Sequence, residues 1–481
     1  MMICKHTMGW SAPFCERTKT EEGRKLKKVW RMMLLTMLLM VLSGCVFRNP
    51  DELYQLPQKS PGYEMLTRAI NEVQRNLEIE FGKVESAIVY AGDHTSNIQL
   101  QDLNSDGTPE TAVTFLRVPG AELPLRIYFF AKQPDSSYKV SCVVEGPGVA
   151  IYAVDYEDLS GDGWKELVVS WQSSANLYQL GVYSLSGGTA DGPDQLPEAT
   201  ELMRSTYSGY SLLDIDQDSR TELLVARVDP AGTNSQAELY GWSDGTFATL
   251  GTTRLSNGIA ALTKVRSNFV EGLMRAVYIT STLTDGGQAT DIVAWRGGEL
   301  ANLTLNPETG ISNETIRGYT ISPQDVNGDI IMEMPRPHLM PSAIDGVSRW
   351  FIDWSQYDLE GRSDRVFTTY HDQSYNWYFE IPDHWVDEVT VSLDTSVSGE
   401  RAVIFQHWNG PDEEPTPFLA IYLLTGINRN IRAEQGDRFI LSEDTSTIYA
   451  ASLVPCKWNH GLDEMAVLNR FHRTVTSWAK D

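Results

Sequence analysis

The sequence predicts a mainly β protein, a β-propeller of about five or more four-stranded blades followed by a small α+β C-terminal domain. Three observations lead to this prediction. An acidic motif recurs with a period of 56 residues, short β-branched and apolar runs flank its copies, and glycine and proline separate those runs. The chain has 481 residues, 42% of them hydrophobic and 21% charged, which is enough apolar material for more than one compact core.

The N-terminal part of the chain has the features of an export signal. Five Lys and Arg residues in positions 24–31 precede an uncharged apolar run at 32–42. This run is about half as long as the ~20 residues that a helix needs to cross a bilayer, and therefore suits a signal peptide. The following Leu42-Ser43-Gly44-Cys45 resembles the lipobox of bacterial lipoproteins. The resemblance implies that residues 1–45 are a signal peptide with lipobox, and that a lipid on Cys45 anchors the protein to the extracytoplasmic face of the cell membrane.

The charge of the remaining chain limits its partners. The leader contains eight of the 39 Lys and Arg residues and three of the 64 Asp and Glu residues, so the overall net charge of −25 becomes about −30 after its removal. A surface this acidic repels phosphate backbones, which argues against nucleic acid as a partner and favours cations. Beyond Cys45 only Cys142 and Cys456 remain, so no disulfide framework is predicted.

Residues 46–62 are a proline-containing polar stretch that we interpret as a tether. Apolar residues at helical spacing in 63–77 then predict a short amphipathic helix. We assign this helix and the β-propeller to one domain, residues 63–375, and the rest of the chain to a C-terminal domain, residues 376–481.

The acidic motif places oxygen-bearing side chains at positions 1, 3, 5 and 9 of a nine-residue segment. The first three copies begin 56 residues apart, and the fourth begins 111 residues after the third, which is nearly two periods. A degenerate segment at 267–278 keeps Gly272 but lacks the oxygen ligands, and we interpret it as a fifth copy that has lost its metal. The motif residues are Asp102, Asn104, Asp106 and Glu110; Asp158, Ser160, Asp162 and Glu166; Asp214, Asp216, Asp218 and Glu222; and Asp325, Asn327, Asp329 and Glu333.

This pattern suits calcium chemically. Ca²⁺ takes six to eight oxygen ligands, and alternating side chains of a tight loop can all point at one centre. Without a counterion, each pair of neighbouring carboxylates costs on the order of 1 kcal/mol even in water. The alternative is a set of ordinary Asp/Asn/Gly turns, whose side chains bond their own backbone. Recurrence in register favours bound Ca²⁺ with a structural role.

A period of about 50 residues is that of a four-stranded propeller blade. The runs on either side of the motifs have the β-branched and apolar composition of strands. Strands are expected at 96–100, 111–118, 125–131, 138–144, 167–171, 178–184, 207–213, 223–228 and 237–242.

The four motifs resemble the calcium loops of FG-GAP and VCBS-type repeats, the blades of integrin-α-like propellers and of many bacterial surface proteins. The resemblance covers residues 90–375 and implies calcium ligands at positions 1, 3, 5 and 9 plus a backbone carbonyl at position 7. Gly107 and Gly163 match the glycine of that family at position 6. Ser219 and Ile330 replace it in the other two loops, which puts their turn geometry and their occupancy in question.

From residue 376 the repeat is absent. Strands are expected at 377–385, 389–393, 401–407 and 418–424, and a closing helix at 461–478. The aromatic residues of 350–385 have two interpretations: strand core, or an exposed surface that stacks on sugar rings.

No catalytic motif stands out, since the chain lacks G-x-S-x-G, H-E-x-x-H, P-loop and C-x-x-C sequences. We therefore predict a lipid-anchored, calcium-binding module that is not an enzyme and that binds a ligand or protein at the cell surface. The alternative is a protein that binds or hydrolyses envelope glycan, and hydrolysis would require a carboxylate pair facing a cleft.

Overall fold

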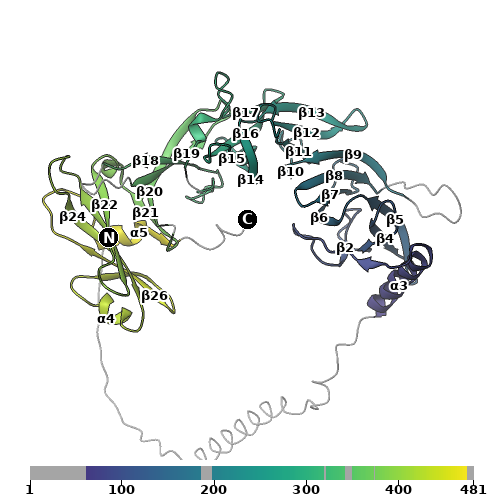
Figure 1. The fold of residues 1–481 in the computed structure, drawn as a ribbon, viewed down its shortest axis with the longest axis horizontal. Coiled ribbons are helices and arrows are strands. Elements are labelled where there is room, and N and C mark those ends of the chain that lie inside the picture. Colours follow the sequence, from purple (N-terminus) through teal and green to yellow (C-terminus); the bar gives the residue numbers. More distant parts are fainter. Residues whose placement is uncertain (1–60, 186–197, 319–320, 342–348, 373, 474–481) are drawn as a thin grey trace, which may run out of the picture. The chain divides into compact units, whose positions relative to one another are not determined.

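The computed structural model describes residues 61–185, 198–318, 321–341, 349–372 and 374–473 (Figure 1). The predicted signal peptide, Cys45 and residues 46–60 of the predicted tether lie outside these ranges. The chain divides into two compact units, Met1–Thr67 and Arg68–Asp481. Within the described ranges it forms 27 strands and three α-helices, which confirms a mainly β fold. No helix in this part of the chain is both long and apolar enough to span a bilayer.

The first described element is α3, Pro61–Phe81. Proline fits the first helical position because its missing N–H has no intrahelical partner there. Leu66, Ile70 and Leu77 are buried along one face, as the helical spacing predicts. The helix ends at Gly82, whose φ of 84° is left-handed and whose amide donates to the carbonyl of Glu78 at 3.0 Å. This glycine cap satisfies a carbonyl that the helix end would otherwise leave free.

The strands of the second unit form six antiparallel sheets, the first four of which are built from strands that follow one another along the chain. The first sheet contains β1 (Glu85–Ser86), β2 (Ile98–Gln101), β3 (Thr111–Arg117), β4 (Leu125–Lys132) and β5 (Tyr138–Gly146). The second contains β6 (Ala150–Glu157), β7 (Glu166–Ser174), β8 (Leu177–Ser184) and β9 (Thr200–Tyr207); the third β10 (Gly209–Leu213), β11 (Glu222–Arg227), β12 (Gln236–Ser243) and β13 (Thr246–Arg254); the fourth β14 (Ile259–Val270), β15 (Met274–Leu283), β16 (Gln288–Arg296) and β17 (Glu299–Asn302).

The last two sheets have five strands each. The fifth contains β18 (Met334–Leu339), β19 (Trp350–Tyr357), β20 (Ser363–Asp372), β21 (Trp377–Ile381) and β27 (Phe471–Arg473). The sixth contains β22 (Val389–Asp394), β23 (Glu400–His407), β24 (Thr416–Thr425), β25 (Phe439–Glu443) and β26 (Thr447–Leu453). Short helices accompany them at η2 (Asn313–Thr315), η3 (Asp383–Trp385), α4 (Arg429–Ala433) and α5 (Glu464–Arg470).

Burial explains why the inner strands have continuous apolar runs. The first six residues of β7 are all buried, and so are the five central residues of β3. A strand alternates between polar and apolar residues only when one face meets water, and these strands are covered on both faces. Each neighbouring pair of sheets shares at least one apolar cluster: the first pair through Val113 and Trp171, for example, and the third and fourth sheets through Leu224 and Val277.

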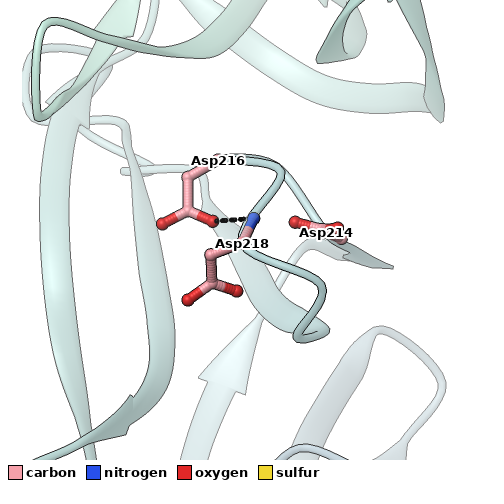
Figure 2. A group of neighbouring side chains, drawn as sticks. All are labelled: Asp214, Asp216 and Asp218. Atoms are coloured by element: carbon pink, nitrogen blue, oxygen red, sulfur yellow. Dashed lines mark hydrogen bonds between the residues drawn. The ribbon is translucent and has the colours of Figure 1, made fainter.

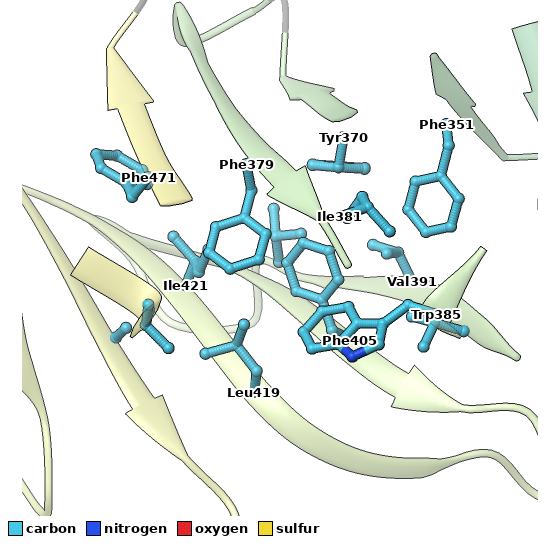
Figure 3. Packing of buried hydrophobic residues seen from close by; sticks show 14 of the residues in the cluster. Phe351, Tyr370, Phe379, Ile381, Trp385, Val391, Phe405, Leu419, Ile421 and Phe471 are labelled. Carbon is cyan, nitrogen blue, oxygen red and sulfur yellow. The ribbon is translucent and has the colours of Figure 1, made fainter. Parts of the chain in front are cut away.

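The predicted domain boundary between residues 375 and 376 falls inside the fifth sheet, because β20 and β21 pair across it. One core joins the fifth and sixth sheets and includes Phe351, Phe379 and Phe405 (Figure 3). Strands are present in each of the four ranges expected between residues 377 and 424.

The expected closing helix is shorter than predicted. It runs only from Glu464 to Arg470, after an N-cap at Asp463 whose Oδ1 accepts the Ala466 amide at 2.8 Å. The chain then becomes β27, in which Phe471 pairs with Phe379 of β21 and is 8% exposed. Helical continuation through residue 473 was therefore wrong, because strand pairing buries Phe471 in the core. Residues 474–478 lie outside the described ranges.

Candidate metal sites in the acidic loops

The four motifs occupy corresponding turns. The motif at 102–110 joins β2 to β3, the one at 158–166 joins β6 to β7, and the one at 214–222 joins β10 to β11. The fourth is closed by a bridge between Gln324 and Glu333 and leads directly into β18. The first three loops therefore each join two neighbouring strands of one sheet, and the fourth leads into the first strand of its sheet.

The backbone has the same unusual conformation in every loop. Position 4 is left-handed, and so is position 6. At position 4, φ is 56° at Ser105, 73° at Gly161, 62° at Gln217 and 80° at Gly328; at position 6 it is 88° at Gly107, 89° at Gly163, 73° at Ser219 and 69° at Ile330. Ser219 and Ile330 thus keep the turn geometry although they lack the glycine. The left-handed region costs an ordinary residue roughly 1–2 kcal/mol, so their loops hold this conformation against a local penalty. Sequence reasoning missed the constraint at position 4.

The same hydrogen bonds recur as well. The amide at position 6 donates to Oδ2 of the aspartate at position 1, and the amide at position 7 donates to Oδ1 of the aspartate at position 5. The first of these bonds is 2.8 Å at Gly107, 2.9 Å at Gly163, 3.1 Å at Ser219 and 2.9 Å at Ile330; the second is 2.8 Å at Thr108, 2.8 Å at Trp164, 2.9 Å at Arg220 and 2.9 Å at Ile331. Bonds of this kind also occur in ordinary aspartate turns. They establish that the four loops share one structure. The burial and the clustering of the carboxylates are what indicate a metal.

The glutamate at position 9 is the most buried acid of its loop in three of the motifs. Glu166, Glu222 and Glu333 are 2%, 4% and 0% exposed. Each accepts the amide of position 2 at Oε2, at 2.9, 3.0 and 2.7 Å. Burial raises the pKa of Glu166, and it raises the pKa of Glu222 and Glu333 to about 7 with a contribution from the neighbouring aspartates. A cation in the loop would offset this penalty.

Two of the loops bring three carboxylates together. Asp214, Asp216 and Asp218 each offer an oxygen within 4.8 Å of the others (Figure 2). The oxygens of Asp325, Asp329 and Glu333 meet the same limit. No third group of this kind occurs in the described part of the chain. Both clusters can hold a metal ion, and they belong to the two loops that lack glycine at position 6.

The cluster at 214–218 contains an unsatisfied atom. Asp214 Oδ1 is buried and has no hydrogen-bond partner within the described residues. Buried polar atoms without a partner are uncommon, and a bound water or ion is one of the explanations for them. A cation held by Asp214, Asp216 and Asp218 would satisfy this oxygen, so the donor set fits a hard divalent ion.

Side-chain amide groups lie against the carboxylates of the first and fourth loops. Asn104 Nδ2 donates to Asp106 Oδ2 and to Glu110 Oε1, both at 3.0 Å. In the fourth loop, Gln356 of β19 donates from Nε2 to Asp329 Oδ2 and Glu333 Oε1, both at 2.7 Å. Hydrogen bonds from Gln356, the Ile331 amide and Asn327 lower the pKa of Asp329 although burial alone would raise it. Rotating either amide would present its oxygen to a cation instead. Gln356 lies outside the motif spacing, which is why sequence reasoning missed it.

The degenerate fifth copy has a shortened turn. Strand β14 continues through Val270 and β15 starts at Met274, so only three residues separate the strands. Gly272 and Leu273 are left-handed, with φ of 83° and 58°. Ser267, at position 1 of this copy, pairs with Val277 and so lies within a strand. It therefore does not occupy the place of the position-1 aspartates in the other loops.

Neighbouring turns also contact one another. The Lys165 amide donates to the carbonyl of Leu103 at 2.8 Å, which connects the first and second loops. Gln217 Nε2 donates to the carbonyl of Leu273 at 2.9 Å, and the Met332 amide to that of Phe269 at 3.1 Å. The turns thus lie at adjoining ends of successive sheets.

Comparisons with known proteins add no family. No family model and no curated protein matches the chain. Among solved structures, the exotype rhamnogalacturonan lyase YesX matches with 11% identity and a TM-score of 0.28, over 69% of this chain and 83% of that one. Rhamnogalacturonan lyase YesW matches with 13% identity and a TM-score of 0.29, over 67% of this chain and 66% of that one. Sqt1 from Chaetomium thermophilum matches with 11% identity and a TM-score of 0.29, over 78% and 100%. Similarities at these TM-scores carry no argument about fold or function.

Proposed function

We propose that this chain is a lipid-anchored, calcium-binding β-propeller lipoprotein of the FG-GAP/VCBS type that binds a ligand or protein on the extracytoplasmic face of the cell membrane. The observation that carries the proposal is the repetition of one loop structure four times, with left-handed residues at positions 4 and 6 and inward-facing aspartates at positions 1 and 5. Such loops concentrate negative charge, and a cation stabilises them.

Calcium is the ion that the ligands favour. All the predicted ligands are oxygens of carboxylates, amides or a hydroxyl, which hard cations prefer. Ca²⁺ tolerates irregular coordination by six to eight oxygens, whereas Mg²⁺ requires a near-ideal octahedron. Millimolar calcium outside cells is sufficient for sites with Kd of about 10⁻⁴ to 10⁻³ M.

The arrangement of strands supports a propeller. The second, third and fourth sheets are antiparallel meanders, and β6 contacts β2 of the first sheet and β10 of the third sheet. Tyr156 of β6 donates to Gln99 Oε1 of β2 at 2.9 Å, and Tyr210 of β10 donates to Asp155 Oδ2 of β6 at 2.6 Å. Repeated meanders that pack through equivalent strands are typical of radial β arrays.

The lipid anchor rests on the sequence of residues 24–45 alone. Acylation of Cys45 is tested by metabolic labelling with a radioactive fatty acid, in the natural chain and in Cys45→Ser. Label and membrane association that both depend on Cys45 would support the anchor. Equal labelling of the two proteins would contradict it.

The calcium proposal is tested by thermal unfolding of the full chain in detergent, with calcium, with magnesium and with chelator. A ligand at a hundredfold excess over its Kd stabilises the native state by about 2.7 kcal/mol. We expect calcium to raise the melting temperature several degrees above the chelated protein, and magnesium to raise it less. Identical melting curves in the three conditions would refute the metal sites.

A second candidate function is binding or hydrolysis of an envelope glycan. One observation favours the binding part of it. Eight of the eleven Phe, Trp and Tyr side chains between residues 350 and 385 are buried, whereas Trp350 and Tyr375 are 42% and 41% exposed. Trp350 lines the same cavity as Arg401, and the Tyr375 ring lies under the Arg401 guanidinium.

A further inference from the structure

A turn at one end of the sixth sheet exposes two isoleucines. Strand β24 stops at Thr425, and Gly426, whose φ of 80° is left-handed, leads the chain into α4 (Figure 1). Ile427 lies in this turn and is 95% exposed, and Ile431 of α4 is 63% exposed. We call residues 426–433 the isoleucine turn.

The two isoleucines take no part in the core beneath α4. Ala433 attaches this helix to the sheet instead, because it is 3% exposed and packs in one cluster with Leu424. A third apolar side chain lies nearby. Val397 is 48% exposed in the turn between β22 and β23, and this turn is joined to the end of β24 by the Thr425 amide, which donates to the Gly399 carbonyl at 2.9 Å. Exposed apolar side chains that are grouped in this way mark interaction surfaces, whereas single ones are ordinary.

The isoleucine turn is basic within an acidic protein. It contains Arg429 and Arg432, and residues 415–433 include no Asp or Glu although the whole chain has 64. Both guanidinium groups donate to backbone carbonyls, Arg429 to that of Thr445 at 3.0 Å and Arg432 to that of Thr425 at 3.5 Å. Neither forms an ion pair with a carboxylate among the described residues. Two positive charges therefore remain unbalanced beside the exposed isoleucines.

Apolar side chains next to arginine suit the surface of an anionic bilayer. There the apolar groups enter the boundary between headgroups and acyl chains, while arginine binds the lipid phosphates. The net charge of −25 repels such a membrane at long range. Salt screens this repulsion over a Debye length of about 8 Å, so the charges of the contacting turn decide the outcome at the surface. The next acids along the chain, Glu434 and Asp437, are exposed and follow α4.

The proposed lipid anchor would hold the isoleucine turn within reach of the membrane. Residues 46–60 separate Cys45 from α3, and a fully extended chain of this length spans about 50 Å. A tether of limited length gives the folded part a high effective concentration at the bilayer. A contact made by a few side chains, which is weak by itself, then becomes significant.

We propose that the isoleucine turn docks onto an anionic phospholipid bilayer, with Ile427 and Ile431 at the edge of the acyl chains and with Arg429 and Arg432 at the lipid phosphates. The proposal goes beyond the binding of a ligand or protein, because it gives the sixth sheet a surface that contacts the membrane itself. It rests on the lipid anchor proposed above for its high local concentration, and it does not require occupied calcium loops.

The test is amide hydrogen exchange, read by mass spectrometry, on the full chain reconstituted into phosphatidylcholine vesicles with and without phosphatidylglycerol. We expect amides of the isoleucine turn to exchange about tenfold more slowly on the vesicles that contain phosphatidylglycerol. Raising the salt to about 1 M, where the Debye length is about 3 Å, should remove most of this difference.

Three variants identify the groups responsible. Ile427→Ser combined with Ile431→Ser should abolish the protection, and since both side chains are exposed the variant should keep the natural melting temperature. Arg432→Gln keeps a donor for the Thr425 carbonyl but removes a charge, so the protection should depend less on phosphatidylglycerol. Ile88→Ser is the matched control, because this isoleucine is 54% exposed and lies outside the isoleucine turn; exchange in the turn should stay within twofold of the natural protein.

Fatty-acid labelling of the same samples separates this proposal from the anchor. Acylated protein whose isoleucine turn exchanges equally fast on both kinds of vesicle would overturn the docking and leave the anchor standing. Protein without the label would remove the anchor, and the docking would then stand only if phosphatidylglycerol still protected the turn. Unchanged protection in the folded isoleucine variant would also overturn it. So would protection that rises with protein concentration in detergent alone, since a second copy of the chain would then be the partner.

Discussion

The substitution Asp216→Asn should change stability in opposite directions with and without calcium. Asp216 offers an oxygen within 4.8 Å of both Asp214 and Asp218, and its pKa is raised by burial and by these two neighbours. At that separation each repulsion is about 1 kcal/mol in water before screening by salt. Because asparagine keeps an oxygen to accept the Asp218 amide, which Asp216 Oδ1 accepts at 3.1 Å, the chelated variant should be about 1 kcal/mol more stable than the natural protein.

With calcium the order should reverse. At a hundredfold excess over Kd, calcium contributes about 2.7 kcal/mol, and a variant whose site binds a hundredfold more weakly retains only about 0.4 kcal/mol. The loss of about 2.3 kcal/mol exceeds the relief of repulsion, so the variant should be about 1 kcal/mol less stable in calcium. The assay is thermal unfolding of both proteins in calcium and in chelator, where 1 kcal/mol corresponds to roughly 2–4 °C for a domain of 150–250 residues.

The matched control is Asp229→Asn. Asp229 also accepts backbone amides two and five residues later, at 2.9 Å from Ala231 and 3.0 Å from Asn234, but it lies outside the motifs. Its effect should be the same in calcium and in chelator. If Asp216→Asn behaved like this control, the loop at 214 would be an ordinary aspartate turn and our reasoning would be refuted.

Three further predictions follow from the geometry. Ser219→Gly should stabilise the chelated protein by about 0.5–1 kcal/mol in urea unfolding. The energy released when a left-handed serine is replaced by glycine exceeds the cost of the greater backbone entropy of glycine in the unfolded chain. A loss of stability would show that the serine is not strained. Phe471→Ala should cost about 3–5 kcal/mol by removing a buried ring from the core, so a change below about 1 kcal/mol in the same assay would mean that β27 does not dock as described. Burial lowers the pKa of His371 from 6.5 to about 4. Its contribution to the free energy of unfolding, up to roughly 3 kcal/mol, is therefore present above pH 6.5 and is lost as the pH falls through 4. The stability of His371→Phe, measured by unfolding between pH 3.5 and 7.5, should depend less on pH than that of the natural protein, and parallel profiles would contradict the assignment.

The recurrence of the acidic motif was sufficient to predict corresponding turns in successive sheets, because a fixed register of ligands requires repeated local structure. It could not reveal left-handed backbone at Ser105 and Gln217, since neither residue type signals that conformation. The absence of glycine put the turn geometry at Ser219 and Ile330 in question, yet both keep it. In both loops the amide at position 6 donates to the aspartate at position 1, and the amide at position 7 donates to the aspartate at position 5. These hydrogen bonds hold the turn without the glycine.

Longer-range features were harder to predict. Gln356 reaches the fourth loop from β19, and Phe471 leaves an apparent helix to pair with β21. Apolar residues at helical spacing surround Phe471 in the sequence, but the edge of β21 with which it pairs exists only in the tertiary structure. Such context overrides local propensity. The same reason explains why a boundary at residue 376, drawn from the end of the repeat, falls inside a continuous sheet.

The shortened fifth copy suggests what the other loops need a cation for. Strand β14 pairs with β15 up to Val270, so backbone hydrogen bonds hold this end of the sheet together. In the other copies the nine-residue motif lies at the corresponding position between the two extended segments. Its aspartates would repel one another. Where the turn between the paired segments is three residues long, the ligands are absent; where it is eight or nine residues long, they are present. We therefore expect calcium to act mainly on these sheet ends, so that chelation increases amide hydrogen exchange at Leu103, Leu159 and Ile215 while the β14–β15 turn stays unchanged. An equal increase at the β14–β15 turn would indicate global destabilisation and would contradict a role for calcium in each separate loop.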